Sequence, residues 1–193
     1  MLFKKIIKYI FYSIALFFGS SIIAVVLTKW INPVITPAML LRSIEGVFEG
    51  KFVGINQDWV SFEEISPNFF RAVVAAEDAK FMRHDGFDRK AIEAAKRYNE
   101  IHKGKKKRGA STISMQTAKN TFLYHWRNYV RKALEAYFTI LIENIWGKKR
   151  IIEVYANVIE FGEGLYGVEA ASQYFFGKSA RNLSRREAAL LAA

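Results

Sequence analysis

The sequence contains no cysteine and little histidine, and both absences exclude classes of chemistry. Without cysteine the chain has no disulfide framework and no thiolate chemistry. Only three histidines occur, and no two of them are spaced as a His-x-x-x-His pair, so a histidine-based metal site is not expected. The lack of cysteine fits any cellular compartment, so the location of the protein must be inferred from other features.

Charge is missing from one long run near the N-terminus, which predicts a membrane anchor. From Tyr9 to Leu27 there is no charged residue, and a helix of that length nearly spans the hydrocarbon core of a bilayer. Three lysines precede the run and only Lys29 follows it closely, so the positive-inside rule places the N-terminus in the cytoplasm. Trp30 stands at the expected interfacial level. A cleavable signal peptide is the alternative, but no convincing small-x-small site follows the run, which is also long for a signal peptide.

Acidic residues are scarce relative to basic ones, which indicates an anionic partner. Lysine and arginine number 29 against 18 acids, so the net charge is +11, and no acid occurs from Gly104 through Tyr129. Such an excess is typical of proteins that meet nucleic acid, a membrane surface or a phosphate-bearing substrate. Nucleic acid is not expected as a partner if the domain lies outside the membrane. With 193 residues, 51% of them hydrophobic, the chain is long enough for about one domain with its own core.

The rest of the chain is predicted to form a linker and one helical domain. Residues 31–65 have mixed patterns with two prolines, so we expect a linker with short extended pieces. After residue 66 there is no repeat and no strong strand pattern, so the fold class is predominantly α. The domains are therefore the anchor at 1–30, the linker at 31–65 and the helical domain at 66–193.

Helix signals give the approximate boundaries within that domain. Starts are marked by Ser66-Pro67, by Asp88, by Ser111 or Thr112, and by a capping box of Ser184 and Glu187. Helices are expected at about 67–83, 89–98, 113–122, 128–146, 148–159, 165–176 and 185–193, with a mobile basic loop at 99–108. The last helix has no stop signal, so we expect the natural protein to continue beyond residue 193.

Two adjacent acids end an apolar helical stretch, residues 69–88, with the sequence FFRAVVAAEDAKFMRHDGFD. Steps of three and four residues place on one helix face Phe70, Val73, Val74, Glu77 and Phe81, with Asp78 beside that face. An ionised carboxylate on an apolar face is costly unless it is paired. Glu77 is therefore either satisfied by an arginine or a helix N-terminus, or it is a catalytic base whose pKa is raised by burial. His84 is expected to brace the turn at Gly86.

A second polar cluster lies in the stretch RGASTISMQTAKN, at residues 108–120. Thr112, Gln116 and Lys119 line one helix face near the N-terminus of that helix, where anions bind readily. A solvated polar face is the alternative. The basic, glycine-containing approach to this helix favours an anion site.

A third cluster groups cations around an acid in the stretch WRNYVRKALEAY, at residues 126–137. Arg127, Arg131, Lys132 and Glu135 are expected on one side of a long helix. Arg131 and Glu135 are spaced for an ordinary helix salt bridge. The same residues could instead form a phosphate clamp beside an acid, because arginine matches phosphate oxygens bidentately.

Five motifs in order resemble those of the peptidoglycan glycosyltransferases of family 51, from about residue 66 to residue 193. They read EDAKFMRHDGFD, GASTISMQTAKNTFL, RKALEAYFTILIE, KKRIIEVYANVIEFGEGLYGVEAAS and LSRREAALLAA. The resemblance implies a lysozyme-like helical glycosyltransferase domain that polymerises glycan strands in bacteria. A single anchor and a short linker resemble the monofunctional biosynthetic transglycosylases of that family more than the glycosyltransferase domain of a class A penicillin-binding protein. The resemblance also implies the bacterial inner membrane, with the catalytic domain outside the cytoplasm.

The resemblance assigns roles to the residues of the three clusters. Glu77 matches the general base that takes the proton from the 4-hydroxyl of lipid II, which attacks a glycan held by a lipid diphosphate. The diphosphate is stabilised at positions matching Lys119, Arg127, Arg131 and Lys132. Glu135 matches a second glutamate that positions these cations or a divalent ion, Mg²⁺ or Mn²⁺. Asp78, Ser111 and Gln116 match polar substrate contacts.

The resemblance bears on cofactors and partners as well. No tightly bound cofactor is expected. The implied partners are lipid II, lipid-linked glycan strands, the membrane and other cell-wall synthesis or division proteins. The chain departs from the family at Met115-Gln116, where two glutamines are usual, and we interpret Met115 as a packing position.

Two rival functions make different use of the same residues. A cell-wall hydrolase on the lysozyme-like fold would use Glu77 as a general acid, but its neutral leaving group would not need a row of cations. A membrane-anchored module that binds anionic lipids or polymers would use the basic stretch KGKKKRG at 103–109, but it would leave Glu77 and Glu135 without a role.

Overall fold

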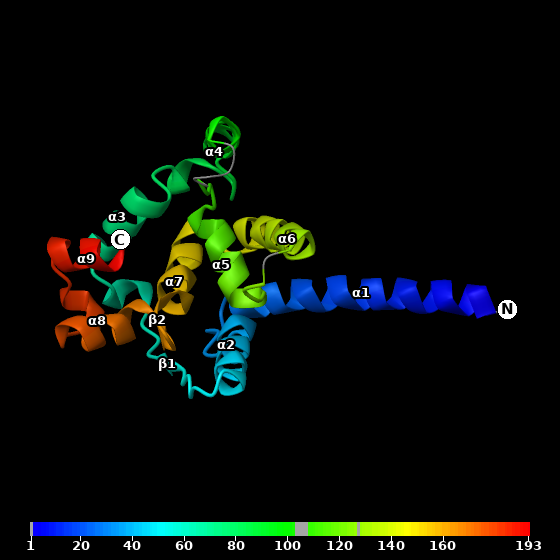
Figure 1. The fold of residues 1–193 in the computed structure, drawn as a ribbon, viewed down its shortest axis with the longest axis horizontal. Helices are drawn as coiled ribbons and strands as arrows, with labels where there is room; N and C mark the ends of the chain where they lie inside the picture. Colours follow the sequence, from blue (N-terminus) through cyan, green and yellow to red (C-terminus); the bar gives the residue numbers. More distant parts are fainter. Residues whose placement is uncertain (1, 103–107, 127) are drawn as a thin grey trace.

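The structure, a computed structural model, describes residues 2–102, 108–126 and 128–193. The described part is mostly helical, with a long helix that projects from a globular body (Figure 1). The helices are α1 (Leu2–Thr28), α2 (Pro37–Phe48), α3 (Pro67–Glu77), α4 (Arg89–Ile101), α5 (Ile113–Phe122), α6 (Tyr129–Ile145), α7 (Lys148–Val158), α8 (Val168–Phe176) and α9 (Arg185–Leu191). The predicted predominantly α class is confirmed, and the expected starts of α3, α4, α5 and α9 are correct.

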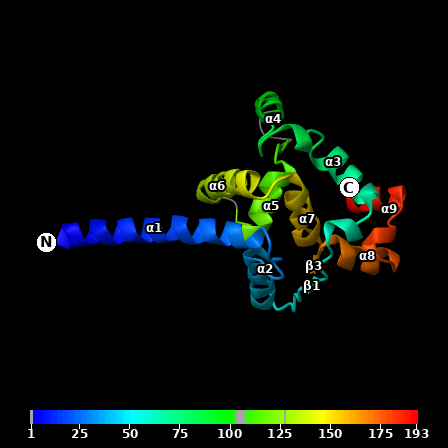
Figure 2. The ribbon, with the colours of Figure 1, turned by 180° about the vertical axis from the view of Figure 1, so that it is seen from behind.

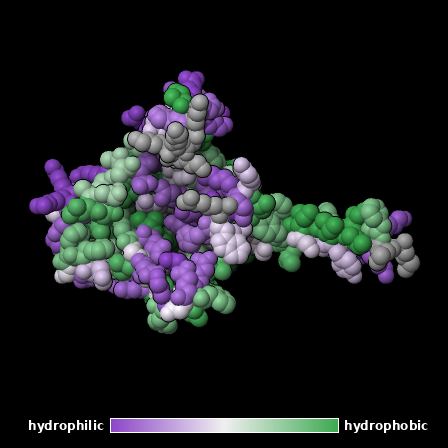
Figure 3. All heavy atoms as spheres, in the orientation of Figure 1, coloured by the Kyte–Doolittle hydropathy of each residue, from purple (hydrophilic) through white to green (hydrophobic). Residues whose placement is uncertain are grey.

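The projecting helix α1 is the predicted apolar anchor. Its segment Phe3–Thr28 is long and apolar enough to cross a membrane, and its side chains are largely exposed (Figure 3). Among the described residues, side chains of that body hydrogen-bond to the C-terminal half of α1. The indole of Trp146 donates to the Val25 carbonyl at 2.7 Å, and the Arg150 guanidinium donates to the Thr28 carbonyl at 2.9 Å. Tyr137 shares a hydrogen bond with Ser21 of α1 at 2.8 Å, so the anchor is packed against the body and not merely tethered to it.

The expected extended linker is wrong over residues 37–48, which form α2. The Thr36 hydroxyl accepts a hydrogen bond from the Met39 amide, and Pro37 occupies the first helical position. This is a normal helix start, because a capping hydroxyl and an N1 proline satisfy or remove orphan amides. Burial of Met39 then anchors α2 to the body.

The sequence patterns do not predict the three very short strands of the described residues. They are β1 (Asn56–Gln57), β2 (Glu160–Gly162) and β3 (Leu165–Tyr166). The sheet order is β1-β3-β2, with β1 parallel and β2 antiparallel to β3. Two or three residues are too few for a recognisable alternation, and β3 takes the first residues of the helix expected at 165–176.

Helix α3 ends at Glu77 and not near Arg83 as expected. Asp78 leaves the helix with φ −156°, and Phe81–Arg83 form a separate 3₁₀ turn, η2. Phe81 is therefore not on the same helix face as Glu77. The helix ends here because the Asp78 side chain bonds to groups outside α3, and these bonds are not encoded in the local pattern.

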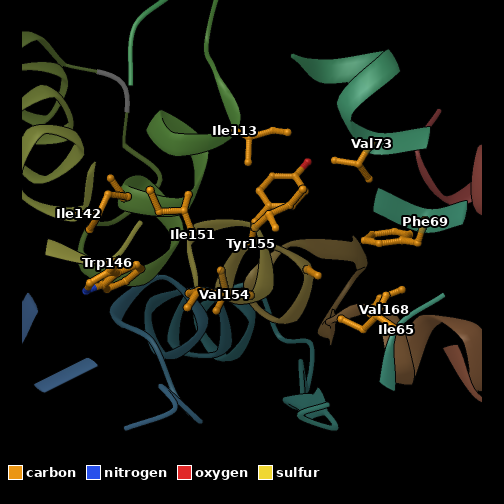
Figure 4. Close-up of a cluster of buried hydrophobic side chains, with 14 of the residues drawn as sticks. Ile65, Phe69, Val73, Ile113, Ile142, Trp146, Ile151, Val154, Tyr155 and Val168 are labelled. Atoms are coloured by element: carbon orange, nitrogen blue, oxygen red, sulfur yellow. The ribbon is translucent and has the colours of Figure 1, made fainter. Parts of the chain in front are cut away.

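Helix α5 lies at the centre of the core, between α6 and α7 (Figures 1 and 4). Buried apolar side chains from other elements surround it, including Val73, Ile142, Ile151 and Tyr155, and Ile113 of α5 belongs to the same cluster. Within α5 only Gln116, Lys119 and Phe122 keep partial exposure. Met115 is 5% exposed, which confirms that it is a packing position.

Gly86 is expected to tolerate no side chain, because its backbone and its surroundings both oppose one. Its φ is +89°, and an added Cβ would lie 2.6 Å from Thr139 Cγ2. We expect Gly86→Ala to lower the free energy of unfolding by about 2 kcal/mol or more, measured by denaturant unfolding in detergent.

Gly50→Ala is the matched control, since φ there is +74° but nothing lies within 4 Å of the added Cβ. It should cost only the backbone strain of about 1–2 kcal/mol. Equal losses for the two variants would show that the contact with Thr139 has no effect.

Candidate active site

Glu77 is the last residue of α3, and it is exposed. The expectation of a buried carboxylate on an apolar face is therefore wrong, because the helix ends before that face continues. Its Oε2 accepts a hydrogen bond of 2.6 Å from the side-chain amide, Nε2, of Gln116 on α5. The structure thus brings together two predicted site residues that are 39 positions apart.

Asp78 is the buried acid of the pair, with its side chain 3% exposed. Its carboxylate contacts His84 Nε2 at 2.9–3.0 Å and accepts from the Ile113 amide at 3.1 Å. The amide of Gly86 donates to His84 Nδ1 at 3.1 Å, so the ring donates to Asp78 from Nε2. The sequence offers pairing with a helix N-terminus as one option for Glu77. In the structure it is Asp78 that pairs in this way, with the first amide of α5. The brace at Gly86 by His84 is confirmed.

Two hollows meet at the Glu77–Gln116 pair. The first, here called the alanine hollow, has a volume of about 550 Å³. It is lined by Ala75, Ala76, Glu77, Asp78, Ala79, Lys80, Asp88, Ala91, Ala94, Arg108, Gly109, Ala110, Ser111, Thr112 and Gln116. The second, here called the Lys119 hollow, has a volume of about 400 Å³ and also contains Glu77 and Gln116. Because both residues line both hollows, a group held in either hollow can reach the Glu77 carboxylate.

The Lys119 hollow contains residues that the sequence analysis did not single out. Tyr155 is 4% exposed, and Figure 4 shows its hydroxyl pointing toward the gap between Ile113 and Val73. Burial, together with the nearby negative charge of Glu77, raises the pKa of Tyr155, so its hydroxyl stays protonated as a donor. Tyr155 lies in one of the quoted motifs, but only the packing of α7 against α5 shows that it faces the hollow.

His125 is the second unexpected residue of the Lys119 hollow. Desolvation of the part of its ring inside the hollow lowers the pKa of His125, and the positive charge of Lys119 lowers it further. The imidazole is therefore neutral at neutral pH. A lone histidine in a loop gave no sequence signal for this position.

The cations on α6 bind an acid of their own helix. Arg131 contacts the Glu135 carboxylate at 2.5 Å, and Lys132 contacts its other oxygen. Glu135 is 2% exposed, and none of the α6 residues lines the alanine hollow or the Lys119 hollow. The helix salt bridge is confirmed, and the structure does not bring these three residues to Glu77. Arg127 lies outside the described residues, as does part of the loop at 99–108 that was expected to be mobile.

The surroundings of Glu135 do not fit a divalent ion. Both carboxylate oxygens already bind cations, and the described part of the chain has no cluster of three or more His, Cys, Asp or Glu that could hold a metal. Divalent ions such as Mg²⁺ prefer several oxygen ligands. We therefore assign no step of the chemistry to a metal at Glu135.

Comparison with known proteins gives a consistent result. The sequence model of the family described as Transglycosylase matches residues 46–193. The chain is 55% identical over 186 residues to the biosynthetic peptidoglycan transglycosylase of Bdellovibrio bacteriovorus, covering 96% of this chain and 74% of that protein. The proteins of the same name from Caulobacter vibrioides and Bacteroides thetaiotaomicron are 52% and 47% identical. These matches cover 89% and 98% of this chain, and 72% and 76% of those proteins. The names agree with the monofunctional biosynthetic class expected from the single anchor and the short linker.

Substitution of the two adjacent acids should change the free energy of unfolding by very different amounts. Asp78→Ala leaves the Ile113 amide and the His84 ring without their buried acceptor. Each unsatisfied donor costs about 1–3 kcal/mol, so we expect a loss of roughly 2 kcal/mol or more in the free energy of unfolding. Glu77→Gln changes an exposed residue and should stay within about 0.5 kcal/mol of the unchanged chain. Denaturant unfolding in detergent measures both, and comparable losses would show that Asp78 does not join α3 to α5.

Proposed function

The chain belongs to the transglycosylase family and is a peptidoglycan glycosyltransferase that polymerises glycan chains, and we propose that Glu77 is its general base. The observation that carries this proposal is the position of Glu77 on the boundary between two hollows. A glycosyl transfer needs two sugars held side by side with a base between them. Among the residues that the structure describes, only Glu77 and Gln116 line both the alanine hollow and the Lys119 hollow.

The proposed substrates are lipid II as acceptor and a glycan on a lipid diphosphate as donor. The 4-hydroxyl oxygen of the acceptor attacks the anomeric carbon of the donor, and its proton passes to the Glu77 carboxylate. The bond between that carbon and the diphosphate breaks, and the diphosphate leaves with the electron pair. Because a sugar hydroxyl is a very weak acid, Glu77 takes the proton as the new bond forms.

Gln116 is proposed to orient the base. Its amide donates to Oε2 of Glu77, and Oε1 has no hydrogen bond among the residues that the structure describes. That free oxygen is available to the acceptor hydroxyl. Gln116 is itself fixed because it lies in α5, whose first amide is bound by Asp78.

The leaving diphosphate is proposed to bind in the Lys119 hollow. Lys119 supplies a positive charge, and the protonated hydroxyl of Tyr155 faces the same space. Charge-assisted hydrogen bonds to phosphate strengthen as the leaving group gains charge, so they stabilise the transition state more than the ground state. Arg127, which lies outside the described residues, is proposed to contact the same diphosphate. Ser111 and Lys80 line the alanine hollow and are proposed to contact sugar groups in it.

The anchor is proposed to cross the bacterial inner membrane once, with the N-terminus in the cytoplasm and the globular body outside. Both substrates carry lipid tails and remain in the same membrane. The hydrogen bonds of Trp146 and Arg150 to the end of α1 hold the body close to that surface. Enzyme and substrates therefore meet within a layer and not through bulk solution.

Glu77→Gln should lower the turnover of labelled lipid II by roughly 10²–10⁴, the usual effect of removing a general base. The variant keeps the size of the side chain and an acceptor for Gln116. Polymerisation in detergent measures the rate, and unfolding curves confirm that the variant is folded. Near-normal turnover by the folded variant would show that another group takes the proton.

Lys119→Ala should weaken turnover and the binding of a phosphoglycolipid inhibitor together, by roughly 10–100-fold, because one charge-assisted contact is lost. Arg127→Ala is predicted to behave in the same way. Glu77→Gln should leave the affinity for the inhibitor nearly unchanged. Lys96→Ala, an exposed change on α4, is the control for net charge. Unchanged inhibitor affinity in Lys119→Ala would contradict the phosphate role without affecting the role of Glu77.

A further inference from the structure

Helix α2 exposes an apolar face on the side opposite to its contacts with the globular body. Met39 and Gly46 are buried on the inner side of α2, which packs against α5 and against Val53. Four large apolar side chains of α2 are between 48% and 87% exposed: Leu40, Ile44, Val47 and Phe48. Their i, i+4, i+7, i+8 spacing places them together on one helix face, here called the outer face of α2.

The two charged residues of α2 bind the body and do not lie on the outer face. Arg42 pairs with Glu163 at 3.2 Å, and the indole of Trp126 donates to Glu45 at 3.1 Å. A surface helix of a water-soluble domain normally has the opposite arrangement, with its charged residues turned outward. The outer face of α2 therefore fits an apolar environment better than bulk water.

Exposed apolar residues continue on both sides of α2 in the chain. Phe52, just after α2, is 94% exposed. The Lys29 ammonium lies over the Trp30 ring, 5.3 Å from its centre, and such rings and cations are frequent where a membrane meets water. Four residues between α1 and α2 are more than half exposed: Trp30, Ile31, Val34 and Ile35. An exposed apolar surface of this extent marks an interaction site.

The position of α2 favours a lipid surface as the partner. Among the described residues, Phe3–Thr28 is the one helical segment long and apolar enough to cross a membrane, and α2 begins nine residues after it ends. Both ribbon views show α2 running across the direction of α1, at the end of α1 that meets the body (Figures 1 and 2). A helix that crosses a bilayer stands roughly upright in it, so a helix that runs across its end lies along the membrane surface.

We propose that α2 lies in the membrane interface with its outer face among the acyl chains of the lipids, as a second attachment beside α1. The proposal rests on the proposed membrane position of α1, and it does not depend on the roles of Glu77 and Lys119. Because Glu45 also holds Trp126, this attachment keeps the loop that carries His125 close to the membrane surface. The diphosphates of the proposed lipid-linked substrates lie at the same surface.

The absence of cysteine allows a direct test, because each introduced cysteine is the only thiol of the chain. A nitroxide label is attached to the full chain in vesicles of phosphatidylethanolamine and phosphatidylglycerol, at one of three exposed positions. These are Val47→Cys on the outer face, Ile14→Cys in α1 and Arg186→Cys on α9. Helix α9 lies on the side of the body away from α1 and is the reference for water (Figures 1 and 2). Relaxation of each label is measured with oxygen, which concentrates in hydrocarbon, and with a water-soluble nickel chelate.

The ratio of oxygen to nickel accessibility at Val47 should exceed that at Arg186 by about fivefold or more, because an interfacial helix buries its apolar face below the headgroups. If Val47 matches Arg186 while Ile14 is shielded from nickel, the proposal is overturned and α1 still lies in the membrane. If nickel also reaches Ile14, the proposed membrane position of α1 fails together with this one. A Val47 label shielded from both reagents would overturn the proposal in favour of a protein partner.

Ile44→Ser combined with Phe48→Ser should lower the accessibility ratio at the Val47 label by about threefold or more, because two of the apolar side chains that hold α2 in the lipid are lost. Tyr174→Ser combined with Phe175→Ser is the matched control, since it removes two exposed aromatic or apolar side chains from α8. The control should leave the ratio at Val47 unchanged. Equal effects of the two double substitutions would overturn the proposal, because they would show that the outer face does not contact lipid.

Discussion

The structure depends most on the buried carboxylate of Asp78. A buried carboxylate is stable only when its oxygens are hydrogen-bonded, and the donors here come from His84 and from the first residue of α5. These bonds attach the end of α3 to the start of α5. Glu77 is covalently next to Asp78, and Gln116 lies one turn beyond Ile113. The contact between Glu77 and Gln116, and with it the boundary between the two hollows, follows from that attachment.

A second buried carboxylate reinforces the same region from the other side. Glu143 of α6 accepts from Ser114 of α5 and from Lys148 of α7, and Lys148 also donates to the His84 carbonyl. The turn that holds His84 is therefore fixed by both networks. Removing one partner from such a network leaves a buried charge or donor without a hydrogen-bond partner, which is costly. The network therefore favours one arrangement of these side chains even where its net contribution to stability is small.

The same α6–α7 region connects the globular body to α1. Trp146, at the end of α6, and Arg150, in the first turns of α7, both bind backbone carbonyls near the end of α1. Carbonyls at a helix C-terminus lack intrahelical partners, so a guanidinium there satisfies them and complements the helix dipole. A continuous set of packed elements thus runs from α1 to Glu77.

The sequence by itself determined the features that depend on neighbouring residues. The uncharged run predicted α1, and capping residues placed the starts of α3, α5 and α9, because a cap acts within three residues of the helix it begins. The i, i+4 spacing likewise predicted the pair of Arg131 and Glu135. The motif order predicted the family, which the family model and the relatives confirm.

Only the tertiary structure decided which acid is buried, where α3 ends, and which cations reach the hollows. The helical periodicity predicted that the Glu77 side chain is buried. Instead, Asp78 is buried, because its carboxylate hydrogen-bonds to His84 and to the Ile113 amide where α3 ends. Tyr155 and His125 line the Lys119 hollow because α7 and the loop after α5 pack beside it. Arg131 and Lys132 instead bind Glu135 on their own helix. Each of these outcomes rests on contacts between residues distant in the chain, and a local pattern of polarity contains no information about such distances.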